Sequence, residues 1–548
     1  MTRKGTLMME SISRRNFVKG GLASAAAVAL AACGGSEGSS SQSGPTKKVL
    51  RWGQSNAKLG LDMQKSTNSG SSAISESIFE APLRWTEDNE LVTCLLTEVP
   101  AFESDGLTLH CTLKDGIKFH DGTTMTANDV KYTFERMFTP ATAAKSTYMY
   151  DKIVGATEML AGTATELTGL TVEDDTHFTF VLTEPMSSFV SNLGISYAQI
   201  FPKDACEAAG ENWGWGTNCI GSGKYKVASN DDTTEIVLEK FADYHDGEPA
   251  LDEIQITYYD DNNTKLMAFK NGDIDWCDLS ADMLEQYKND ADVKDCITQY
   301  ETLGVQFVNL NLKEGQGLED VRVRQALSLA INRQELVDTT LSGSGTVAGC
   351  WLAPQTPGHD SSVTIDYDVE KAKSLMAEAG VSNLSLTCKT RTGIYQKYMT
   401  VIQSYWKEIG VDLDVQIEDN GVWSSDWADG NLQVTALGWF PLFADADNHM
   451  YTYFYSENAA KKSSFYNNAE VDELLKQARV SQDQDERAEL YKQADHIIVH
   501  EDWATIPLYW PKNAFVAKSY VKNAKVGNLI YHFFDLDVDT TDPNYPAA

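Results

Sequence analysis

Two histidines set four residues apart form the one pattern in this sequence that suggests metal ligation. His496 and His500 stand at helical spacing and Glu501 follows them, so a helix would place both imidazoles on one face. The glutamate that a zinc protease carries inside such a pair is missing. A solvated helix face is the alternative that we favour, and we predict no metal site.

The motifs of common catalytic sites are missing as well. Beyond residue 46 the sequence contains no G-x-S-x-G, no H-E-x-x-H and no G-x-x-x-x-G-K-S/T. The nucleophile, zinc and phosphate chemistry that these motifs provide therefore has no support. We predict that the protein is not an enzyme and that it needs no cofactor.

An arginine and two tryptophans are candidates for ligand binding. Arg391 and Tyr395 lie between a strand-like stretch and a predicted helix, where a guanidinium can pair with both oxygens of a ligand carboxylate. A solvent-exposed arginine is the commoner alternative. Trp423 and Trp427 lie in a Gly- and Asp-containing stretch that predicts a loop, where the indoles would either form a wall for a ligand or pack between subdomains.

Eight cysteines follow Cys33, at positions 94, 111, 206, 219, 277, 296, 350 and 388. In an exported protein an even number permits four disulfides, although the sequence does not choose among the many possible pairings. No C-x-x-C occurs, so neither a zinc ribbon nor a thioredoxin-like redox site is supported.

The elements that would position these residues alternate between helix and strand. Residues 397–409 keep apolar side chains at helical spacing, Gly410 ends that helix, and residues 411–417 then alternate between apolar and polar. A second helix is predicted over 485–499, ahead of a strand-like segment at 506–509. A helix followed directly by a strand is typical of α/β construction, which is the fold class we predict.

Further elements are predicted closer to the N-terminus. Residues 107–113 alternate like a half-buried strand, and residues 128–138 look helical. Asp320 precedes a predicted helix over 321–337, and an apolar stripe over 372–379 ends before a glycine. At about 100 to 200 residues per domain, the 548 residues allow roughly three or four domains or lobes.

The N-terminus carries a different pattern. Residues 13–19 read SRRNFVK, a twin-arginine signature, and the Ala-rich stretch 20–32 is shorter than the about 20 residues that span a membrane. Residues 30–33, LAAC, look like a lipobox. We predict a signal peptide over 1–32, lipid attachment at Cys33 and a flexible tether over 33–46. The alternative is a short buried helix.

The charge of the chain excludes some partners. The formal net charge is −34, and removing residues 1–32, with five basic side chains and one acidic, brings it to −38. Such a surface repels nucleic acid and anionic headgroups. Solubility is the favoured explanation, and capture of cations is the alternative.

Several segments together resemble one known family. Those around residues 105–108, 118–122 and 126–130, reading DGLT, KFHDG and TANDV, resemble the signature of family-5 extracellular solute-binding proteins, the peptide- and nickel-binding proteins of ABC importers. Other segments agree in order: 220–225 with Lys224 in place of the usual proline, 271–275, 320–327, 366–380, 471–479 and 506–509. The resemblance runs from about residue 48 to the end.

The resemblance implies a two-lobed periplasmic-binding-protein-like clamp of the class with an extra subdomain, its mixed sheets covered by helices. Ligand would be enclosed between the lobes by hinge closure. The implied limits are lobe I over 47–83, 200–300 and 505–548, the extra subdomain over 84–199, and lobe II over 301–504.

The implied function is that of an extracytoplasmic receptor. It would capture short peptides or a related small ligand and deliver them to an ABC permease, as a monomer anchored by lipid to the outer face of the cell membrane. Alternatives are a non-peptide ligand such as a metal chelate, a modified peptide or an oligosaccharide, and, less favoured, an extracellular hydrolase.

The resemblance also places residues in the cleft. Residues 437–448 resemble the family's cleft-lining G-W-x-x-D-Y-P-D-P segment, which implies that Trp439 and Phe440 line the pocket; an ordinary core tryptophan is the alternative. Peptide binders carry a carboxylate at the fifth position to pair with the ligand's α-ammonium, where this chain has Leu442. Either Asp445 or Asp447 substitutes, or the ligand's amine is absent or blocked.

The resemblance also assigns roles to one aspartate and two asparagines. Asp445 aligns with the family's second aspartate, for which capping a turn is the alternative to ligand contact. Asn309 and Asn311 resemble a strand near the hinge and would offer amide hydrogen bonds.

Overall fold

The computed structural model describes residues 46–55, 60–526 and 536–546. The predicted signal peptide, Cys33 and the tether up to residue 45 lie outside the described residues. Residues from Lys47 onwards form one compact unit. Within the described ranges, no helix combines the length and the apolar character needed to cross a bilayer.

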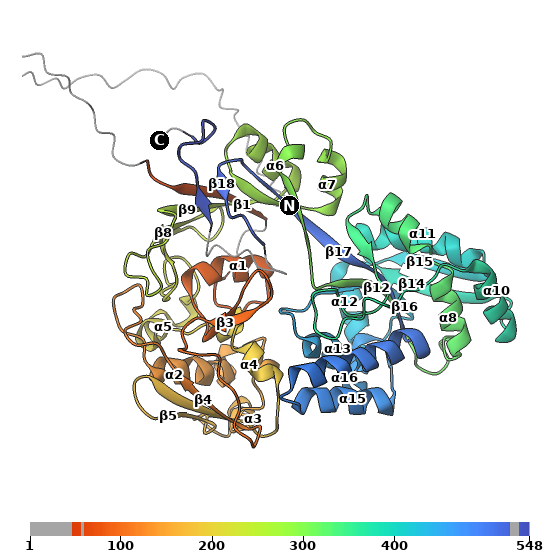
Figure 1. The fold of residues 1–548 in the computed structure, drawn as a ribbon, viewed down its shortest axis with the longest axis horizontal. Helices are drawn as coiled ribbons and strands as arrows, with labels where there is room; N and C mark the ends of the chain where they lie inside the picture. Colours follow the sequence, from red (N-terminus) through yellow and green to blue (C-terminus); the bar gives the residue numbers. More distant parts are fainter. Residues whose placement is uncertain (1–45, 56–59, 527–535, 547–548) are drawn as a thin grey trace, which may run out of the picture. The chain divides into compact units, whose positions relative to one another are not determined.

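One mixed sheet organises most of this unit, and its strands fall into two groups (Figure 1). In the first group β1 pairs in parallel with β9 and β10, while β7, β8 and β9 form an antiparallel meander. The group comprises β1 (Val49–Ser55), β7 (Tyr225–Asn230), β8 (Glu235–Lys240), β9 (Glu253–Tyr259), β10 (Trp276–Leu279) and β11 (Ile297–Glu301). We call the region packed around it lobe I.

The second group forms the sheet of lobe II. β14 pairs in parallel with β15 and β16, and β16 pairs antiparallel with β12. The group comprises β12 (Val305–Leu310), β13 (Gly345–Val347), β14 (Leu384–Thr390), β15 (Val411–Ile417) and β16 (Val434–Trp439). Every residue of β12 is buried, because helices cover both faces of this sheet.

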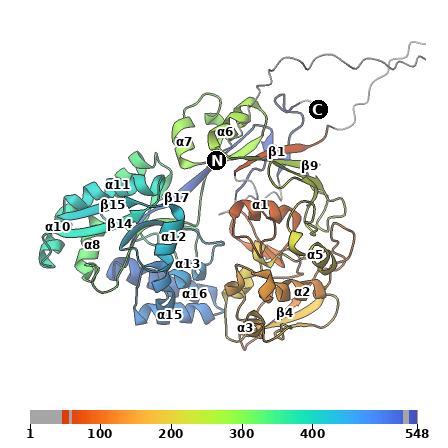
Figure 2. The ribbon, with the colours of Figure 1, turned by 180° about the vertical axis from the view of Figure 1, so that it is seen from behind.

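A single long strand joins the two groups. β17 (Thr505–Ala517) pairs with β12 and β13 through its first half and with β10 and β11 through its second half. Figures 1 and 2 show it running from one lobe into the other. The predicted strand at 506–509 is confirmed, and it extends eight residues farther, through Ala517.

The helices of lobe II follow the predicted patterns closely. α11 (Ile394–Lys407) runs directly into β15, and α16 (Gln484–His496) precedes β17, so both helix-then-strand units are confirmed. The other helices are α8 (Val321–Leu329), α9 (Arg333–Glu335), α10 (Val369–Glu378), α12 (Asn420–Ala428), α13 (Ala446–Phe454), α14 (Ser456–Ala459) and α15 (Ala469–Val480).

The predicted helix over 321–337 is interrupted. Asp320 caps α8 by accepting a hydrogen bond from the amide of Arg322 at 2.9 Å, as the sequence predicts. The buried guanidinium of Arg333, however, donates to the Ser328 carbonyl at 3.0 Å. The same carbonyl accepts from the Ile331 amide at 3.3 Å in a tighter turn, and α8 ends at Leu329 before a new turn starts after Asn332.

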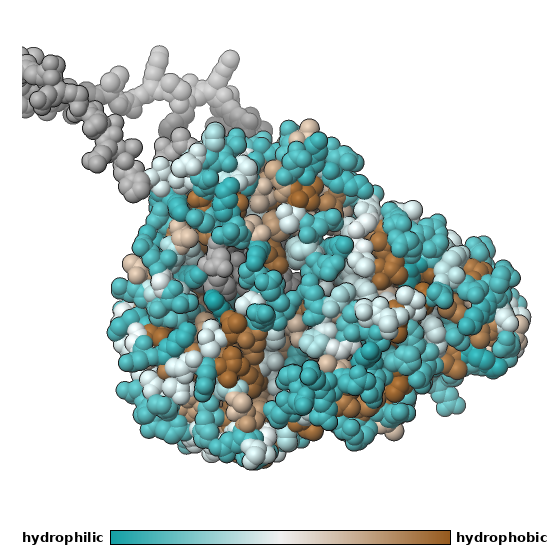
Figure 3. Space-filling view, viewed as in Figure 1, coloured by the Kyte–Doolittle hydropathy of each residue, from teal (hydrophilic) through white to brown (hydrophobic). Residues whose placement is uncertain are grey.

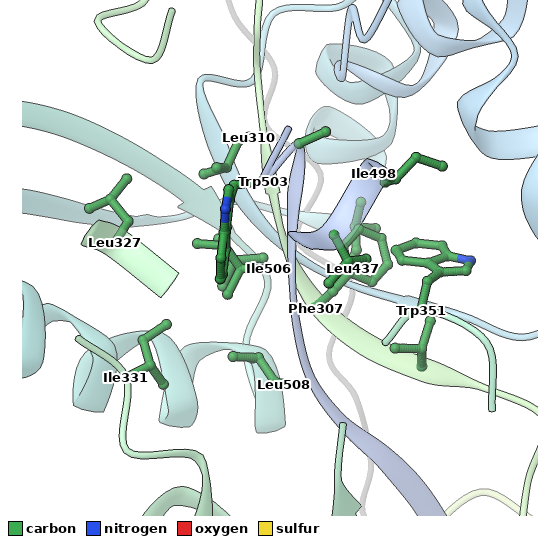
Figure 4. Packing of buried hydrophobic residues seen from close by; sticks show 14 of the residues in the cluster. Phe307, Leu310, Leu327, Ile331, Trp351, Leu437, Ile498, Trp503, Ile506 and Leu508 are labelled. Atoms are coloured by element: carbon green, nitrogen blue, oxygen red, sulfur yellow. The ribbon is translucent and has the colours of Figure 1, made fainter. Parts of the chain in front are cut away.

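Lobe II has the largest hydrophobic core of the described residues. Phe307 of β12 packs edge-on against Trp351 with ring centroids 4.5 Å apart, and Ile506 and Leu508 of β17 lie in the same cluster (Figure 4). Aromatic pairs of this geometry contribute about 0.5–1.5 kcal/mol beyond the apolar area they bury. The core therefore fixes β17 where it leaves lobe II.

The remaining elements form lobe I and the extra subdomain. Strands β4 (Thr108–Thr112), β5 (Leu170–Val172) and β6 (His177–Val181) make a three-stranded antiparallel sheet in the extra subdomain, covered by α2 (Ala127–Phe138). The predicted strand at 107–113 and helix at 128–138 are confirmed. The others are α1 (Ser69–Ile78), β2 (Leu83–Trp85), β3 (Leu91–Thr93), α3 (Ala156–Leu160), α4 (Ser188–Asn192), α5 (Lys203–Ala209), α6 (Asn262–Asn271), α7 (Ala281–Tyr287), β18 (Val521–Lys522) and β19 (Asp537–Val538).

Separate hydrophobic clusters underlie these regions. One runs from Met63 to Ile200 and includes Phe443 from lobe II, and we use the name extra subdomain for the region packed around it. Two more clusters lie in lobe I on either side of its sheet. The exact limits of the lobes stay a prediction.

The eight cysteines of the described residues are all free thiols, so the four disulfides that the sequence permits do not form. They are spread over several cores: Cys94 and Cys111 lie in that of the extra subdomain, Cys206 and Cys219 in one of lobe I, and Cys388 in that of lobe II. Burial raises the pKa of the Cys388 thiol to about 12, which keeps it protonated and unreactive.

We expect these eight thiols to be found unlinked in the exported protein. Alkylation in denaturant without a reductant, followed by peptide mapping, should modify all eight, because each of them is a free thiol in the structure. The native protein should react far more slowly, since seven of the eight thiols are buried. A disulfide-linked peptide in the unreduced digest would contradict this result.

Candidate functional site

A cavity of about 640 Å³ lies between lobe II and the region formed by lobe I and the extra subdomain. One wall carries Thr67, Tyr148, Asp151, Lys152 and Tyr197, and the other includes Trp439, Phe440, Leu442, Tyr451, Lys462 and Arg479. Its volume is in the range of small-molecule sites, which commonly form where domains meet. Hydrophobic residues gather beside the groove at the centre of Figure 3.

Trp439 and Phe440 reach the cavity at the end of a central strand. β16 ends at Trp439, whose indole nitrogen donates to the Asn448 carbonyl at 3.2 Å and whose ring packs on Tyr453. Phe440 passes so close to Gly304 that a Cβ there would lie 2.4 Å from its ring. Glycine at position 304 thus allows Phe440 to turn toward the cavity.

Arg391, Tyr395, Trp423 and Trp427, which the sequence analysis selected from separate motifs, lie in one row with Lys462 and Trp439. We call this row of stacked rings and cations the ladder. The Arg391 guanidinium lies 4.2 Å from the Tyr395 ring centroid and 4.1 Å from that of Trp423. Trp423 stacks on Trp427 with centroids 5.8 Å apart. The Lys462 ammonium then lies between Trp427 and Trp439, at 5.0 and 5.2 Å.

The ladder keeps its cations free of carboxylates. Among the described residues neither Arg391 nor Lys462 has an ion-pair partner, and the Nε atom of Arg391 is buried without a hydrogen bond. Ring faces stabilise such cations by about 0.5–2 kcal/mol each. Burial lowers the pKa of Lys462, and the neighbouring charge of Lys461 lowers it further. The arrangement offers positive charge to an anionic group entering the cavity.

The prediction that Trp423 and Trp427 lie in a loop is wrong, because both lie on α12. Asp419 caps this helix by accepting from the Gly421 amide at 2.8 Å, and Gly430 in the left-handed region follows its end. Polar residues and the flanking glycines concealed a capped helix. Trp423 is buried and Trp427 half-buried, and neither lines the cavity directly.

Asn309 and Asn311 use their amides within the protein. Asn309 donates to the Ser463 carbonyl at 3.0 Å and accepts from the Tyr453 hydroxyl at 3.0 Å. Asn311 donates to the Leu432 carbonyl at 2.9 Å. The structure therefore does not bring them to the cavity; Asn309 instead holds the segment that carries Lys462.

Asp445 and Asp447 both interact with other groups of the protein. They are the two carboxylates that the sequence analysis considered as substitutes for the one missing at position 442. Asp445 caps α13 through the Asp447 amide and forms an ion pair with Arg487 at 2.8 Å, with both side chains 6% exposed. Asp447 accepts from the Tyr491 hydroxyl at 3.1 Å and lies 3.6 Å from Arg479. The capping alternative for Asp445 fits the structure better than ligand contact.

These carboxylates also bind the opposite lobe. Ser188 of α4 donates to Asp447 at 3.0 Å, and Ser191 donates to Asp445 at 3.3 Å. The backbone amide of Ser187 donates to the Arg479 carbonyl at 2.9 Å. Burial alone would lower the pKa of Arg487, but attraction to Asp445 raises it above its ordinary value. The acids of the 445–447 segment therefore belong to the contact between the lobes.

Leu442 and Phe443 extend the same contact with apolar side chains. Leu442 packs against the extra-subdomain cluster as well as lining the cavity, and Phe443 stacks on Trp85 with centroids 5.4 Å apart. A charged residue at position 442 would have to lose water against this cluster. Leucine at this position is thus consistent with its neighbours.

A second group of cavity residues was not predicted from the sequence. Arg479 stacks on Tyr451 at 4.1 Å, and Tyr451 stacks on Tyr455 with centroids 4.5 Å apart. Burial alone would lower the pKa of Arg479, but Asp447 raises it. Arg479 lies in a segment that the family resemblance had marked, yet only folding brings it to the cavity.

His496 and His500 carry no sign of a metal site. Their rings are stacked 5.3 Å apart, but His500 Nε2 is 2.9 Å from the Gly349 carbonyl and His496 is 53% exposed. No group of three or more ligand-type side chains suited to a metal occurs in the part of the chain that the structure describes.

Comparison with known proteins identifies similar chains. The family model described as "Bacterial extracellular solute-binding proteins, family 5 Middle" matches residues 90–461, and the twin-arginine translocation signal model matches residues 11–31. The glutathione-binding protein GsiB of Escherichia coli strain K12 is 28% identical over 465 residues, which cover 82% of this chain and 86% of that protein.

Two further proteins extend the comparison. The oligopeptide-binding protein OppA of Bacillus subtilis is 25% identical over 518 residues, covering 90% of this chain and 94% of that protein. The structure of DppA from Helicobacter pylori with the peptide STSA superposes with a TM-score of 0.72 at 23% identity, covering 89% of this chain and 98% of that one. The two-lobed α/β fold predicted above is therefore confirmed.

We expect the ion pair of Asp445 and Arg487 to stabilise the protein only while both partners are present. Arg487→Met should lower the free energy of unfolding by about 3–5 kcal/mol, because it leaves a buried carboxylate without its counter-charge. The double variant with Asp445→Asn should recover much of this loss. Urea unfolding followed by tryptophan fluorescence measures both.

Lys373→Ala provides the matched control. Lys373 pairs with Glu370 on the surface, where the two side chains are 46% and 84% exposed and water screens their attraction, so the unfolding midpoint should stay at the wild-type value. If Lys373→Ala destabilised the protein as much as Arg487→Met does, a special role for the buried pair would be contradicted.

Proposed function

We propose, on the premise that this chain belongs to family 5 of the bacterial extracellular solute-binding proteins, that it captures short peptides outside the cytoplasm and delivers them to an ABC permease. Its twin-arginine signal sequence directs export. Similar proteins are named for glutathione and for oligopeptides, and one is bound to a tetrapeptide. The observation that carries the proposal is the cavity between the lobes, walled by aromatic rings and unpaired cations.

The cavity chemistry suits a peptide. Trp439, Phe440 and Tyr451 offer flat apolar surface to side chains of varied shape. Lys462, held between two rings, would attract a peptide carboxylate, and Arg391 with Tyr395 and the Trp423–Trp427 pair extends the positive surface beyond the cavity. Asn309 supports this wall from behind.

Ligand capture would proceed by hinge closure. The hinge would lie where the backbone passes between the two sheets, which is between β11 and β12 and near Pro511 of β17, whose pairing changes there from β13 to β11. These two crossings would bend while each core keeps its packing. The closed form, stabilised by ligand contacts to both walls, would be the form that the permease recognises.

The protein would work as a monomer anchored at the membrane. Lipid on Cys33, with residues 33–46 as a tether, would keep the clamp near its permease. The related proteins are substrate-binding proteins, and we propose that this chain likewise turns nothing over.

We expect the exported protein, purified gently, to carry a series of short peptides that native mass spectrometry can release and identify. Trp439→Ala should weaken binding of the recovered peptides by about tenfold or more, because it removes a desolvated ring from the wall. Trp439→Phe, which keeps an aromatic ring against Tyr453, should lose less. Trp215→Ala, at a 37% exposed tryptophan away from the cavity, is the control.

A single non-peptide mass would instead contradict the peptide assignment. In that case the ligand would be a metal chelate, a modified peptide or an oligosaccharide. If the wild-type protein hydrolysed added peptides faster than they are hydrolysed in buffer alone, its assignment as a receptor would be contradicted.

We expect Cys33→Ala to release the protein from the membrane fraction. The wild-type protein should partition into detergent and show the added mass of a diacylglyceryl group on its N-terminal peptide, whereas the variant should be recovered in the soluble fraction. Cys296→Ala, at a half-buried thiol of lobe I, is the control and should not change partitioning. Unmodified Cys33 in the wild-type protein would contradict lipidation.

A further inference from the structure

One acid of the cavity wall remains without a partner. Asp151 follows the turn at Thr147–Met149 and precedes α3 in the extra subdomain, and it faces the same cavity as Leu442. Its Oδ1 atom is buried and accepts no hydrogen bond. Among the described residues no cation lies within ion-pair distance of its carboxylate.

The cations nearest to Asp151 are held elsewhere. Lys152 pairs with Glu184 at 2.8 Å, and Arg479 stacks on Tyr451 and lies 3.6 Å from Asp447. Burial raises the pKa of Asp151, and the charges of Lys152 and Arg479 oppose that rise. A half-buried carboxylate in this state is stabilised by any cation that enters the cavity.

The other acids near the cavity cannot take this role equally well. Asp445 is paired with Arg487, and Asp447 accepts from Tyr491 and Ser188. Glu457 lines the cavity but is exposed, so water screens its charge. Asp151, on the facing wall and with a buried Oδ1 atom, is therefore the acid of this cavity best placed to replace the carboxylate missing at position 442.

We propose that Asp151 binds the α-ammonium group of the ligand, in place of the carboxylate that Leu442 replaces. The inference rests on the proposed function, and it specifies the ligand as a peptide with a free amino terminus. With Lys462 on the facing wall, the cavity sets the Asp151 carboxylate opposite a cation that no carboxylate neutralises, which is the complement of a short zwitterion.

The position of Asp151 also gives its contact a mechanical consequence. The acid lies in the extra subdomain, whereas the aromatic wall lies in lobe II. A peptide whose amine pairs with Asp151 while its body packs on Trp439 bridges both walls. Recognition of the amine is then coupled directly to closure.

The test compares a mixture of dipeptides to pentapeptides with the same mixture after N-acetylation, using the exported protein and native mass spectrometry. Wild type should prefer the free peptides by at least about 30-fold, because a charged group buried without its partner is strongly disfavoured. Asp151→Asn should reduce this preference to about threefold or less, while Asp151→Glu should keep part of it. Thermal unfolding of Asp151→Asn should match wild type, since no internal partner is lost.

Glu158→Gln is the matched control. It removes one negative charge from the same subdomain at an exposed position of α3 outside the cavity, and it should leave the preference unchanged. If Asp151→Asn keeps the wild-type preference, or if Glu158→Gln loses it equally, the assignment of Asp151 is overturned.

Three other outcomes also decide the matter. Equal weakening of free and acetylated peptides by Asp151→Asn would mean that Asp151 serves lobe closure, through Arg479, and not the amine. Wild-type protein that binds both mixtures alike would overturn amine recognition and leave peptide binding standing. Wild-type protein that binds neither mixture would overturn the proposed function, and this inference with it.

Discussion

The arrangement of this protein depends on the hydrogen-bonded continuity of β17. Its first half belongs to the sheet of lobe II and its second half to the sheet of lobe I, so both sheets share one backbone. Backbone groups of a buried strand must stay paired, which prevents this strand from leaving either sheet. The lobes are consequently tethered at one side of the cavity, and their relative motion is restricted to bending of the strands that cross between them.

A strongly acidic chain nevertheless presents cations to its cavity. At the cavity wall Lys462 lies between two tryptophans, and beyond the cavity Arg391 lies against Trp423 and Tyr395. Carboxylate partners would neutralise these charges and compete with an anionic ligand, whereas ring faces stabilise a cation and leave its charge available. The acids that lie close by, Asp445 and Asp447, are used instead to hold α13, α16 and α4 together.

Local patterns predicted most of the elements correctly. The helix-then-strand unit of α11 and β15 follows from residue spacing and one terminating glycine. The cap at Asp320 follows from the position of this aspartate directly before the helix. Two elements were predicted wrongly. α8 ends at Leu329, in a turn whose Ser328 carbonyl accepts from both the Ile331 amide and Arg333, and α12 was mistaken for a loop because its two tryptophans are spaced among polar residues.

The sequence by itself determined the family, the export signal, the α/β class and the place of Trp439 and Phe440 at the cavity, because each of these is encoded in contiguous residues. Tertiary structure alone decided which groups remain available: Asp445 is taken by Arg487, all eight described cysteines are free thiols, and Asp151 lines the same cavity as Leu442. The reason is physical. Whether a charge is paired or free depends on burial and on neighbours within a few ångströms, and in this fold those neighbours come from segments hundreds of residues apart.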